Sequence, residues 1–343
     1  MPERSSEVAV ITGASAGIGR ATAREFARHG CKIALLARGR RGLEAAADEV
    51  EKLGGEPLVI PTDVADYAAV ERAAGAVAER FGRIDIWVNN AFAGIFSRFT
   101  DMTLEEYRRV TDVTYFGQVH GTRAALKHMM PRDSGAIVLV GSALAYRGIP
   151  LQSAYCAAKH AIQGFQDSVR VELLAGDSNV RLTMVQLPGV NTPQFDWIRA
   201  HTSGTPRPVG GIYQPEVAAR SIWKAAHSAR KQWIVGAPAY QAIEADKLLS
   251  PLLDRYLARG NVEAQQGEPL APGRKDNLFE PLDANEDRGA HGRFDSESRT
   301  LSPLLWASEN RGWIAAGAAL ALGAGLVTAR YRGGKNNGHS THV

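Results

Sequence analysis

The 343-residue chain contains few cysteines and few aromatic residues, and it has no long run of charges of one sign. Its two cysteines, Cys31 and Cys156, are too few for a disulfide framework, which indicates a reducing compartment. Lysine and arginine number 40 against 36 acidic residues, and this near balance, without a basic block, argues against nucleic-acid binding. The sequence has no repeat with a period of about 20–50 residues, which excludes a solenoid.

Long apolar stretches are also scarce. Hydrophobic residues make up 45% and charged residues 22% of the chain, which is typical of a soluble globular protein. This composition excludes wholesale disorder, a collagen-like chain and a polytopic membrane protein. The segment before the first strand-like run has no apolar stretch long enough for a signal peptide, so we expect the folded domain to stay in the cytoplasm.

One uncharged apolar segment stands apart, at residues 313–328. As a helix, these 16 residues would be about 24 Å long, whereas about 20 residues are usually needed to span a bilayer. Trp313 and Tyr331 stand where interface anchors lie in membrane helices. Three arrangements are open: a C-terminal membrane anchor, a helix at a subunit contact, and a helix lying on a membrane surface.

Seven short runs rich in β-branched residues alternate with amphipathic segments of helical period. Continuous apolar strands separated by helices indicate a parallel sheet covered on both faces. We therefore predict an α/β fold, a Rossmann-type doubly wound seven-stranded parallel sheet in a single domain over residues 1–260. The expected strands are Val8–Thr12, Lys32–Ala37, Pro57–Pro61, Ile84–Asn90, Gly135–Gly141, Val180–Leu187 and Gln232–Gly236.

A glycine motif, TGASAGIG at residues 12–19, lies directly between the first strand and the first helix. Gly13 permits the sharp turn, Gly17 lets the backbone approach a pyrophosphate, and Gly19 allows close helix–strand packing. The phosphates would then lie at the positive end of the following helix. Spacing and context together predict a dinucleotide site.

A second motif combines Tyr155 and Lys159 within one expected helix, with Ser142 at the end of a preceding strand. The i,i+4 spacing places Tyr155 and Lys159 on one helix face. A phenol with an ordinary pKa of about 10 is a poor acid–base group at neutral pH, and an adjacent ammonium favours the phenolate. Ser142 can hydrogen-bond a substrate carbonyl or alkoxide beside the tyrosine.

These motifs resemble those of the classical short-chain dehydrogenase/reductase family over about residues 6–240. The resemblance implies hydride transfer between a nicotinamide and a carbonyl or alcohol carbon, with no metal. It implies that Tyr155 is the general acid/base, that Lys159 lowers its pKa and binds the nicotinamide ribose, and that Ser142 orients the substrate oxygen. The cofactor contacts that it implies, together with Tyr155 and Lys159, are Gly13, Ser15, Gly17, Ile18, Gly19, Asp63, Val64, Asn89, Ala91, Pro188, Gly189 and Thr192.

Two positions depart from the family pattern. Phe92 replaces the glycine of the NNAG motif, and Thr114 replaces an asparagine that helps to hold a water in the family's proton relay. A threonine hydroxyl can donate and accept, so it could hold the same water. The enzyme prediction therefore stands without Thr114 among the catalytic residues.

The end of the second expected strand decides the cofactor prediction. An acidic side chain there would accept hydrogen bonds from a ribose 2′-hydroxyl and repel a 2′-phosphate. The strand ends instead at Arg38, whose planar guanidinium can pair with a phosphate. We therefore expect NADP(H) to be favoured over NAD(H).

The segment 191–213 would cover the substrate opening and contains Phe195, Trp197, Ile198 and Tyr213. These aromatics indicate either an apolar substrate or simple packing, and Phe92, Ile95 and Phe96 could extend an apolar wall. Residues 239–259 predict an amphipathic helix that closes the core or covers the same opening. Two alternatives to a reductase remain, an NADP(H)-binding scaffold or sensor with little turnover and an epimerase-like member of the family.

The rest of the chain is harder to interpret. Residues 261–311 predict either a polar linker or an extension draped over the domain, residues 312–330 an apolar helix, and residues 331–343 a basic tail. The family resemblance makes a homodimer or homotetramer the expected assembly, through the helices that contain Tyr155 and Thr114. The expected partner is a small-molecule carbonyl or alcohol, with membrane contact possible through residues 313–328.

Overall fold

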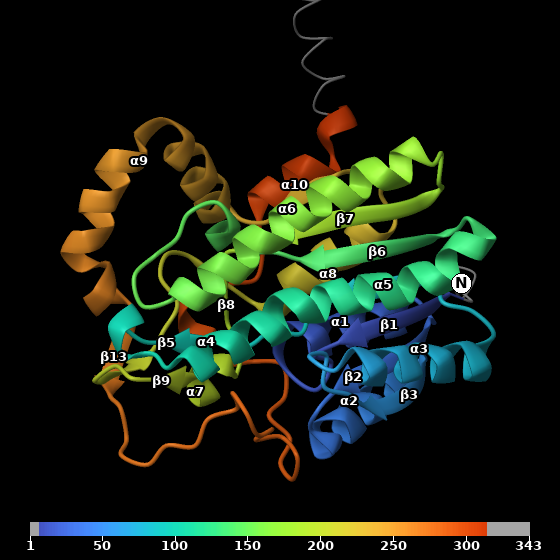
Figure 1. Cartoon of the computed structure of the whole chain (residues 1–343), viewed down its shortest axis with the longest axis horizontal. Coiled ribbons are helices and arrows are strands. Elements are labelled where there is room, and N and C mark those ends of the chain that lie inside the picture. The colour runs from blue at the N-terminus through green and yellow to red at the C-terminus, as the bar shows by residue number, and fades with distance from the viewer. Residues whose placement is uncertain (1–6, 314–343) are drawn as a thin grey trace, which may run out of the picture. The chain divides into compact units, whose positions relative to one another are not determined.

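The computed structural model describes residues 7–313 (Figure 1). Of these, residues 7–301 form one compact unit, and residues 302–313 belong to a second. The second unit contains, among its described residues, helix α10 (Pro303–Glu309), whose first turn is capped by the Ser302 hydroxyl. All further description concerns the first unit.

A seven-stranded sheet forms the centre of the unit, with the order β12-β7-β6-β4-β1-β2-β3. Every neighbouring pair is parallel, which confirms the predicted doubly wound α/β fold. The strands are β1 (Val8–Thr12), β2 (Lys32–Ala37), β3 (Glu56–Pro61), β4 (Ile86–Asn89), β6 (Gly135–Val140), β7 (Val180–Gln186) and β12 (Gln232–Ile234).

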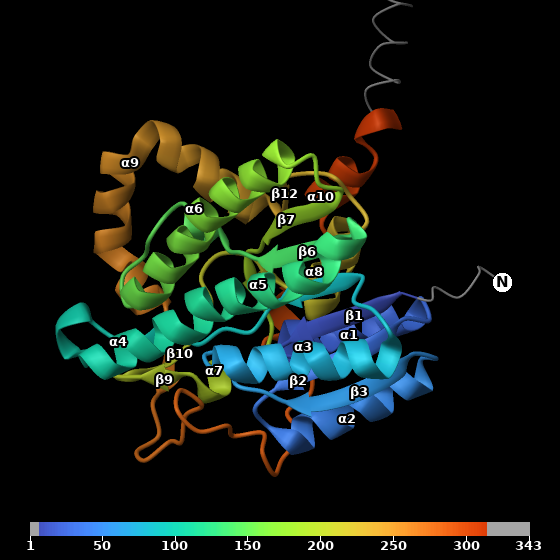
Figure 2. The same cartoon turned by 45° about the vertical axis from the view of Figure 1, so that its right-hand side comes forward.

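Helices cover both faces of this sheet. Figures 1 and 2 show α3, α5 and α6 in front of it, while α1 packs against α2 and α8. Strands β1 and β6 are buried along their whole length, which explains why their sequences are almost entirely apolar. The helices are α1 (Gly17–Arg28), α2 (Arg40–Lys52), α3 (Tyr67–Phe81), α4 (Leu104–Thr111), α5 (Gly117–Met129), α6 (Ser153–Ala175), α7 (Gln194–Trp197), α8 (Pro215–Ala226) and α9 (Ala237–Ala264).

Shorter elements complete the unit at the carboxyl edge of the sheet and in its loops. They are β5 (Ile95–Phe96), β8 (Gly189–Val190), β9 (Arg199–Ala200), β10 (Gly204–Pro206), β11 (Ile212–Tyr213), β13 (Gln266–Pro269) and β14 (Ser298–Arg299), the π-helical turn η2 (Asp112–Phe116), and the 3-10 turns η1 (Phe99–Asp101), η3 (Met130–Arg132), η4 (Ala143–Ala145) and η5 (Asp295–Glu297).

The order of the strands locates the site. From β1 the chain runs outward through β2 to β3 and then returns to β4 on the other side of β1. At such a switch point the connections leave β1 and β4 in opposite directions, and a crevice opens between the carboxyl ends of these strands. The glycine motif follows β1 directly and therefore lines this crevice.

The chain beyond α9 runs along the carboxyl edge of the sheet. Strand β13 pairs with β10 and β14 pairs with β11. In the sequence, the segment between β13 and β14 is the orange one that runs below α7 and to the left of α2 in Figure 2. We call its residues 277–289 the strap. Its contacts with the rest of the unit are described below.

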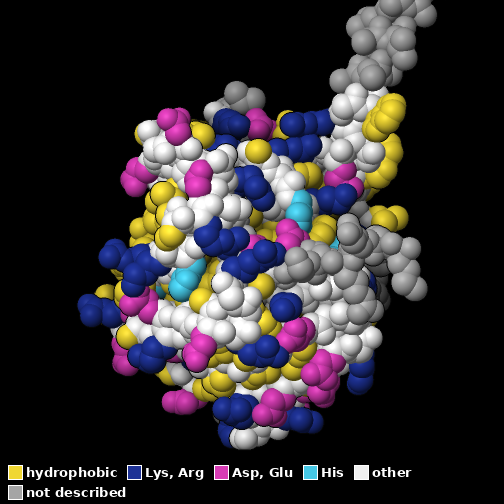
Figure 3. Space-filling model, turned by 90° about the vertical axis from the view of Figure 1, so that its right-hand side faces the viewer, with side chains coloured by type: hydrophobic (Ala, Val, Ile, Leu, Met, Phe, Trp, Pro, Cys, Tyr) yellow, Lys and Arg dark blue, Asp and Glu magenta, His cyan; other side chains and the backbone are white. Residues whose placement is uncertain are grey.

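The surface of the unit carries charges of both signs. Positive and negative side chains are interspersed over the face in Figure 3, as expected from the near-balanced composition. Within residues 7–313, no helix combines the length and the apolar character needed to cross a bilayer. Apart from Trp313, the segment 313–328 lies outside the described residues, so its three proposed arrangements stay predictions.

Candidate active site

Two cavities adjoin at the carboxyl edge of the sheet. The first, of about 140 Å³, lies at the switch point and is called here the switch-point cavity. The second, of about 620 Å³, is bounded on one side by α9 and is called the α9 cavity. Both share wall residues, among them Asn90, Phe92 and Gln194, so a ligand could extend from one into the other.

The glycine motif forms one wall of the switch-point cavity. Gly13 and Gly17 have φ of +66° and +56°, the left-handed region that glycine adopts without strain. A Cβ on Gly17 would lie 3.1 Å from the Thr192 side chain, so a larger residue at this position would press against Thr192. A Cβ on Gly19 would overlap the Gly13 carbonyl oxygen, which shows how closely α1 approaches the turn after β1.

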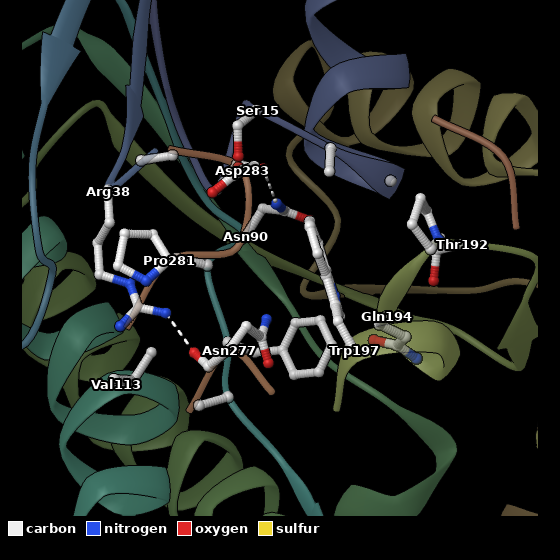
Figure 4. Close-up of a pocket in the computed structure, with 18 of the residues that line it drawn as sticks. Ser15, Arg38, Asn90, Val113, Thr192, Gln194, Trp197, Asn277, Pro281 and Asp283 are labelled. Carbon is white, nitrogen blue, oxygen red and sulfur yellow. Dashed lines mark hydrogen bonds between the residues drawn. The ribbon is translucent and has the colours of Figure 1, made fainter. Parts of the chain in front are cut away.

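Most of the residues that the sequence predicts for cofactor binding do meet in this cavity. Figure 4 shows Arg38 near one end, Thr192 and Gln194 near the other, and Asn90 between them. The predicted residues that line it are Gly13, Ser15, Gly17, Ile18, Arg38, Asp63, Val64, Ala91 and Thr192.

Asn89 is a correction to that set. Its side chain lines neither cavity, because its amide oxygen accepts from the Trp87 indole N–H at 3.0 Å and its amide nitrogen donates to the Thr122 hydroxyl at 3.1 Å. It links β4 to α5 in the core. The neighbouring Asn90 faces both cavities instead, and its Nδ2 donates to the Thr12 carbonyl at 2.9 Å.

The α9 cavity holds the predicted catalytic residues. Ser142, at the end of β6, and Tyr155 and Lys159, on α6, all line it together with Pro188 and Gly189. The Ser142 hydroxyl is hydrogen-bonded to the Tyr155 phenol. Lys159 Nζ donates to the Val140 carbonyl at 2.6 Å and lies 5.5 Å from the centroid of the Tyr155 ring.

The pKa values of this pair differ from the sequence-based expectation. Burial raises the pKa of the Tyr155 phenol, and the hydrogen bond from Ser142 opposes this rise without cancelling it. Burial also lowers the pKa of Lys159 to about 7, so its ammonium is only partly charged at neutral pH. Burial therefore dominates the pKa of Tyr155 in this structure, and Tyr155 is protonated at neutral pH. The assistance of Tyr155 by Lys159 stays a prediction.

The two departures from the family pattern have clear structural roles. The Phe92 ring packs edge-on against the Tyr155 ring at 5.8 Å between centroids. The fully buried Thr114 hydroxyl accepts from the Ala93 amide at 2.9 Å and donates to the Ala93 carbonyl at 2.8 Å. Thr114 thus holds the loop that carries Phe92, and its single donor is already used.

The aromatic and aliphatic residues predicted to line the substrate opening have three different positions in the structure. Phe195 and Ile198 line the α9 cavity, while Trp197 lines the switch-point cavity. Tyr213 is fully buried, and a Cβ on Gly236 would lie 2.8 Å from its ring, so Tyr213 is a packing residue. Ile95 is also a core residue and lines neither cavity.

A family model described as short chain dehydrogenase matches residues 7–202, more than half of the chain. The chain belongs to this family. This short-chain dehydrogenase is 33% identical over 321 residues to the Bacillus subtilis (strain 168) protein named uncharacterized oxidoreductase YxnA, across 91% of this chain and 90% of the relative. It is also 38% identical over 175 residues to human dehydrogenase/reductase SDR family member 7, across 50% of this chain and 52% of that protein.

Solved structures of alcohol-oxidising enzymes share its fold. An alcohol dehydrogenase from Thermococcus sibiricus, complexed with 5-hydroxy-NADP, is 28% identical with a TM-score of 0.58, across 67% of this chain and 96% of that one. An NAD⁺-bound xylitol dehydrogenase is 30% identical with a TM-score of 0.53, across 55% and 72%. Relatives with either nicotinamide cofactor therefore resemble this dehydrogenase.

Two parts of the dehydrogenase site escaped the sequence reasoning. Arg147 lines the α9 cavity and anchors α9, because its guanidinium binds Asp246 at 2.9 Å, the Ser250 hydroxyl at 3.0 Å and the carboxylate of Asp254. The strap contributes Asn277, Pro281 and Asp283 to the switch-point cavity. Both sets of contacts join residues about 100 or more positions apart, for which a single sequence carries no local signal.

Proposed function

We propose that this short-chain dehydrogenase interconverts a carbonyl and an alcohol on an apolar substrate that binds in the α9 cavity. The carrying observation is that Ser142, Tyr155 and Lys159 line this cavity beside the residues that it shares with the switch-point cavity. The apolar substrate is supported by the other wall residues, which include Phe92, Phe96, Phe195, Ile198, Leu253 and Leu257.

The residues that line the switch-point cavity support binding of a nicotinamide dinucleotide. Their polar groups are spread from Arg38 and Asp63 to Thr192, as an elongated ligand with phosphates would need. When bound, such a dinucleotide supplies or accepts the hydride. The glycine motif and the start of α1 would hold its pyrophosphate, at the place where the Gly17 amide donates to the Gly289 carbonyl in this structure.

Side chains of the protein itself supply the proton for the reaction. Tyr155 holds its proton at neutral pH, as a phenol does at its ordinary pKa of about 10, and can donate it to a substrate oxygen during reduction. Burial raises the pKa of Tyr155 further, which favours this protonated form over the phenolate. Ser142 can donate a hydrogen bond to the same oxygen and orient it. Lys159, with a pKa of about 7, can hold or release a proton near neutral pH behind the tyrosine.

The predicted preference for NADP(H) over NAD(H) rests on Arg38, which lines the switch-point cavity. The Thermococcus sibiricus relative with an NADP derivative supports a cofactor of this kind, and the NAD⁺-bound relative supports the other. NADP(H) is thus the preference that Arg38 by itself predicts, and the Asp283 carboxylate in the same cavity opposes it.

The test is oxidation of NADPH and NADH by the purified protein with a panel of apolar ketones and aldehydes, for wild type, Tyr155→Phe and Tyr115→Phe. We expect turnover by the wild type and a loss of at least about a hundredfold in Tyr155→Phe. Tyr115→Phe, which removes a phenol hydroxyl from the π-helical turn η2, should retain activity. Tight binding of a dinucleotide without turnover of any compound would favour the scaffold or sensor alternative.

Assembly and membrane contact also stay predictions. A homodimer or homotetramer through the region of α4 to α6 is testable by light scattering of the full-length protein. Membrane contact through residues 313–328 predicts that a chain ending at Leu301 moves from the membrane fraction to the soluble fraction.

A further inference from the structure

The strap binds the start of α2 through its backbone. The N-cap of α2, Gly39, has no side-chain hydrogen bond to the first turn. The free amides of Gly42 and Arg41 donate instead to the carbonyls of Asp283, at 3.1 Å, and Ala284, at 3.3 Å. The strap therefore caps α2 at the point where the chain leaves β2.

The same contact brings a carboxylate to the end of β2. Asp283 is only 6% exposed, and a Cβ on Gly39 would overlap its carboxylate, so the carboxylate lies directly against the Gly39 backbone. A Cβ on Gly42 would lie 2.9 Å from the second carboxylate oxygen. Asp283 lines the switch-point cavity beside Ser15, as Figure 4 shows.

The strap also binds the guanidinium of Arg38, the group that the sequence analysis predicts will pair with a phosphate. The Arg38 guanidinium donates to the carbonyls of Phe279, at 2.6 Å, and Asn277. Burial and the nearby Arg109 lower the pKa of Arg38, while the Asp283 charge opposes that lowering. A phosphate at this place would have to displace the strap carbonyls from Arg38 and would face the Asp283 carboxylate.

The strap has anchors that do not involve Asp283. The buried Arg20 guanidinium binds the Asp287 carboxylate at 2.8 Å, and the Gly17 amide donates to the Gly289 carbonyl at 3.0 Å. A substitution that removes only the charge of Asp283 should therefore leave the strap in position.

We propose that Asp283 determines which nicotinamide dinucleotide the site accepts, favouring a ribose with a free 2′-hydroxyl over one with a 2′-phosphate. A carboxylate accepts hydrogen bonds from a hydroxyl, whereas a phosphate of about −2 charge is repelled. The repulsion is weakly screened, because the carboxylate is buried. This inference rests on the proposed function. It assigns to Asp283 the role of the acidic side chain that would accept a hydrogen bond from the 2′-hydroxyl, which is missing from the residues directly after β2.

The experiment measures dissociation constants of NADH and NADPH by fluorescence titration for wild type, Asp283→Asn and Glu286→Gln. Glu286 is the matched control, because it is an exposed carboxylate of the same strap that does not line the cavity. The wild type should bind NADH more tightly. Asp283→Asn should raise the affinity for NADPH relative to NADH by at least about tenfold, as expected for removal of a like charge at close range. Glu286→Gln should leave the ratio within about twofold.

Other outcomes distinguish two failures. If the wild type binds a dinucleotide and Asp283→Asn changes the NADPH to NADH ratio no more than Glu286→Gln does, Asp283 is not the determinant. If the wild type prefers NADPH, the inference is overturned as well, while the proposed function stands. If the folded wild type binds neither dinucleotide, both the proposed function and this inference fail. Melting temperatures of the three proteins show whether each variant is folded.

Discussion

The two ends of the switch-point cavity are built in different ways. The end beside α1 comes from one continuous stretch, in which β1, the glycine motif and the first turn of α1 follow each other within residues 8–19. The end beside α2 is completed by Asp283 and Asn277 of the strap, about 240 residues after Arg38. The backbone of the first end is formed by a local stretch, to which the strap adds the Gly289 carbonyl at the Gly17 amide, whereas the charge of the second end comes from a distant segment.

Because of this difference, the sequence alone predicts the structure of one end of the cavity better than that of the other. A local motif carries its own geometry, since the φ of Gly13 and Gly17 and the close approach of Gly19 require glycine whatever lies elsewhere. At the other end, the chemical character of the site changes with the strap. Arg38 alone suggests a phosphate site, and Arg38 with Asp283 suggests a hydroxyl site.

The largest expected effect is at the local end, in Gly19→Ala. A Cβ there would overlap the Gly13 carbonyl and lie 2.7 Å from Asn90 Nδ2, so α1 must shift away from β1. We expect a loss of about 3 kcal/mol or more in the free energy of unfolding, and loss of dinucleotide binding. Urea unfolding and fluorescence titration measure the two effects.

Gly75→Ala is the matched control for that change. Gly75 lies inside α3, and a Cβ there would meet no atom within 4 Å. Alanine should therefore raise the free energy of unfolding by about 0.5–1 kcal/mol. If both alanine variants were equally stable, the tight packing attributed to the glycine motif would be wrong.

The second effect concerns the stability cost of the catalytic lysine. Burial lowers the pKa of Lys159 from its usual 10.5 to about 7, so between these pH values the folded chain binds fewer protons than the unfolded chain. Wild-type stability should consequently rise with pH in this window, with a contribution approaching about 1.4 kcal/mol per pH unit. Lys159→Met should abolish turnover and be more stable than wild type, most clearly at pH 7 and below.

Urea unfolding at pH 6, 7.5 and 9 measures this difference. The stability advantage of Lys159→Met should shrink as the pH rises toward 10, because the neutral lysine is no longer penalised by burial. The exposed Lys52 provides the control, and Lys52→Met should show no such trend. The same trend in both variants would mean that burial of Lys159 is not its cause.

The smallest expected effect is at the distant end, in Asp287→Asn. This change weakens the contact with Arg20 that anchors the strap, while Arg20 keeps its contact with Glu49 at 2.9 Å. We expect amide hydrogen exchange to increase by about tenfold over residues 284–289, with a loss of about 1 kcal/mol or less in global stability. The ratio of NADH to NADPH affinity should stay unchanged.

Glu49→Gln is informative beside it, since it removes the other carboxylate of Arg20 without touching the strap. Exchange over residues 284–289 should stay near the wild-type rate in this variant. A loss of strap protection in Glu49→Gln but not in Asp287→Asn would show that the strap is held by other contacts.

Much of the fold was predictable because its signals are local. The seven strands are apolar runs that the structure reproduces within about two residues at each end, and the parallel order follows from their alternation with helices. The π-helical turn around Thr114 and the loop that it holds to Ala93 were not predictable, because they depend on a contact across 21 residues.

The site was predictable to a similar degree. Tyr155 and Lys159 are one helical turn apart, and Ser142 follows a strand, so local geometry brings them together. The pKa of Tyr155 could not be predicted, since it depends on burial by side chains from several elements. Asn89 was misplaced for a related reason, because its partner Thr122 becomes a neighbour only when α5 packs on β4.

By itself the sequence determined the parallel sheet, the glycine turn and the spacing of the catalytic tyrosine and lysine, all of which arise from backbone conformation and periodicity within short segments. Only the tertiary structure decided the charge at the end of β2 and the wall that α9 gives to the substrate side. The charge at the end of β2 depends on Asp283, which packs against the start of α2. The wall depends on the contacts of Arg147 with α9. Long-range contacts of this kind are determined by the packing of the whole unit, and the local propensities of the sequence do not predict them.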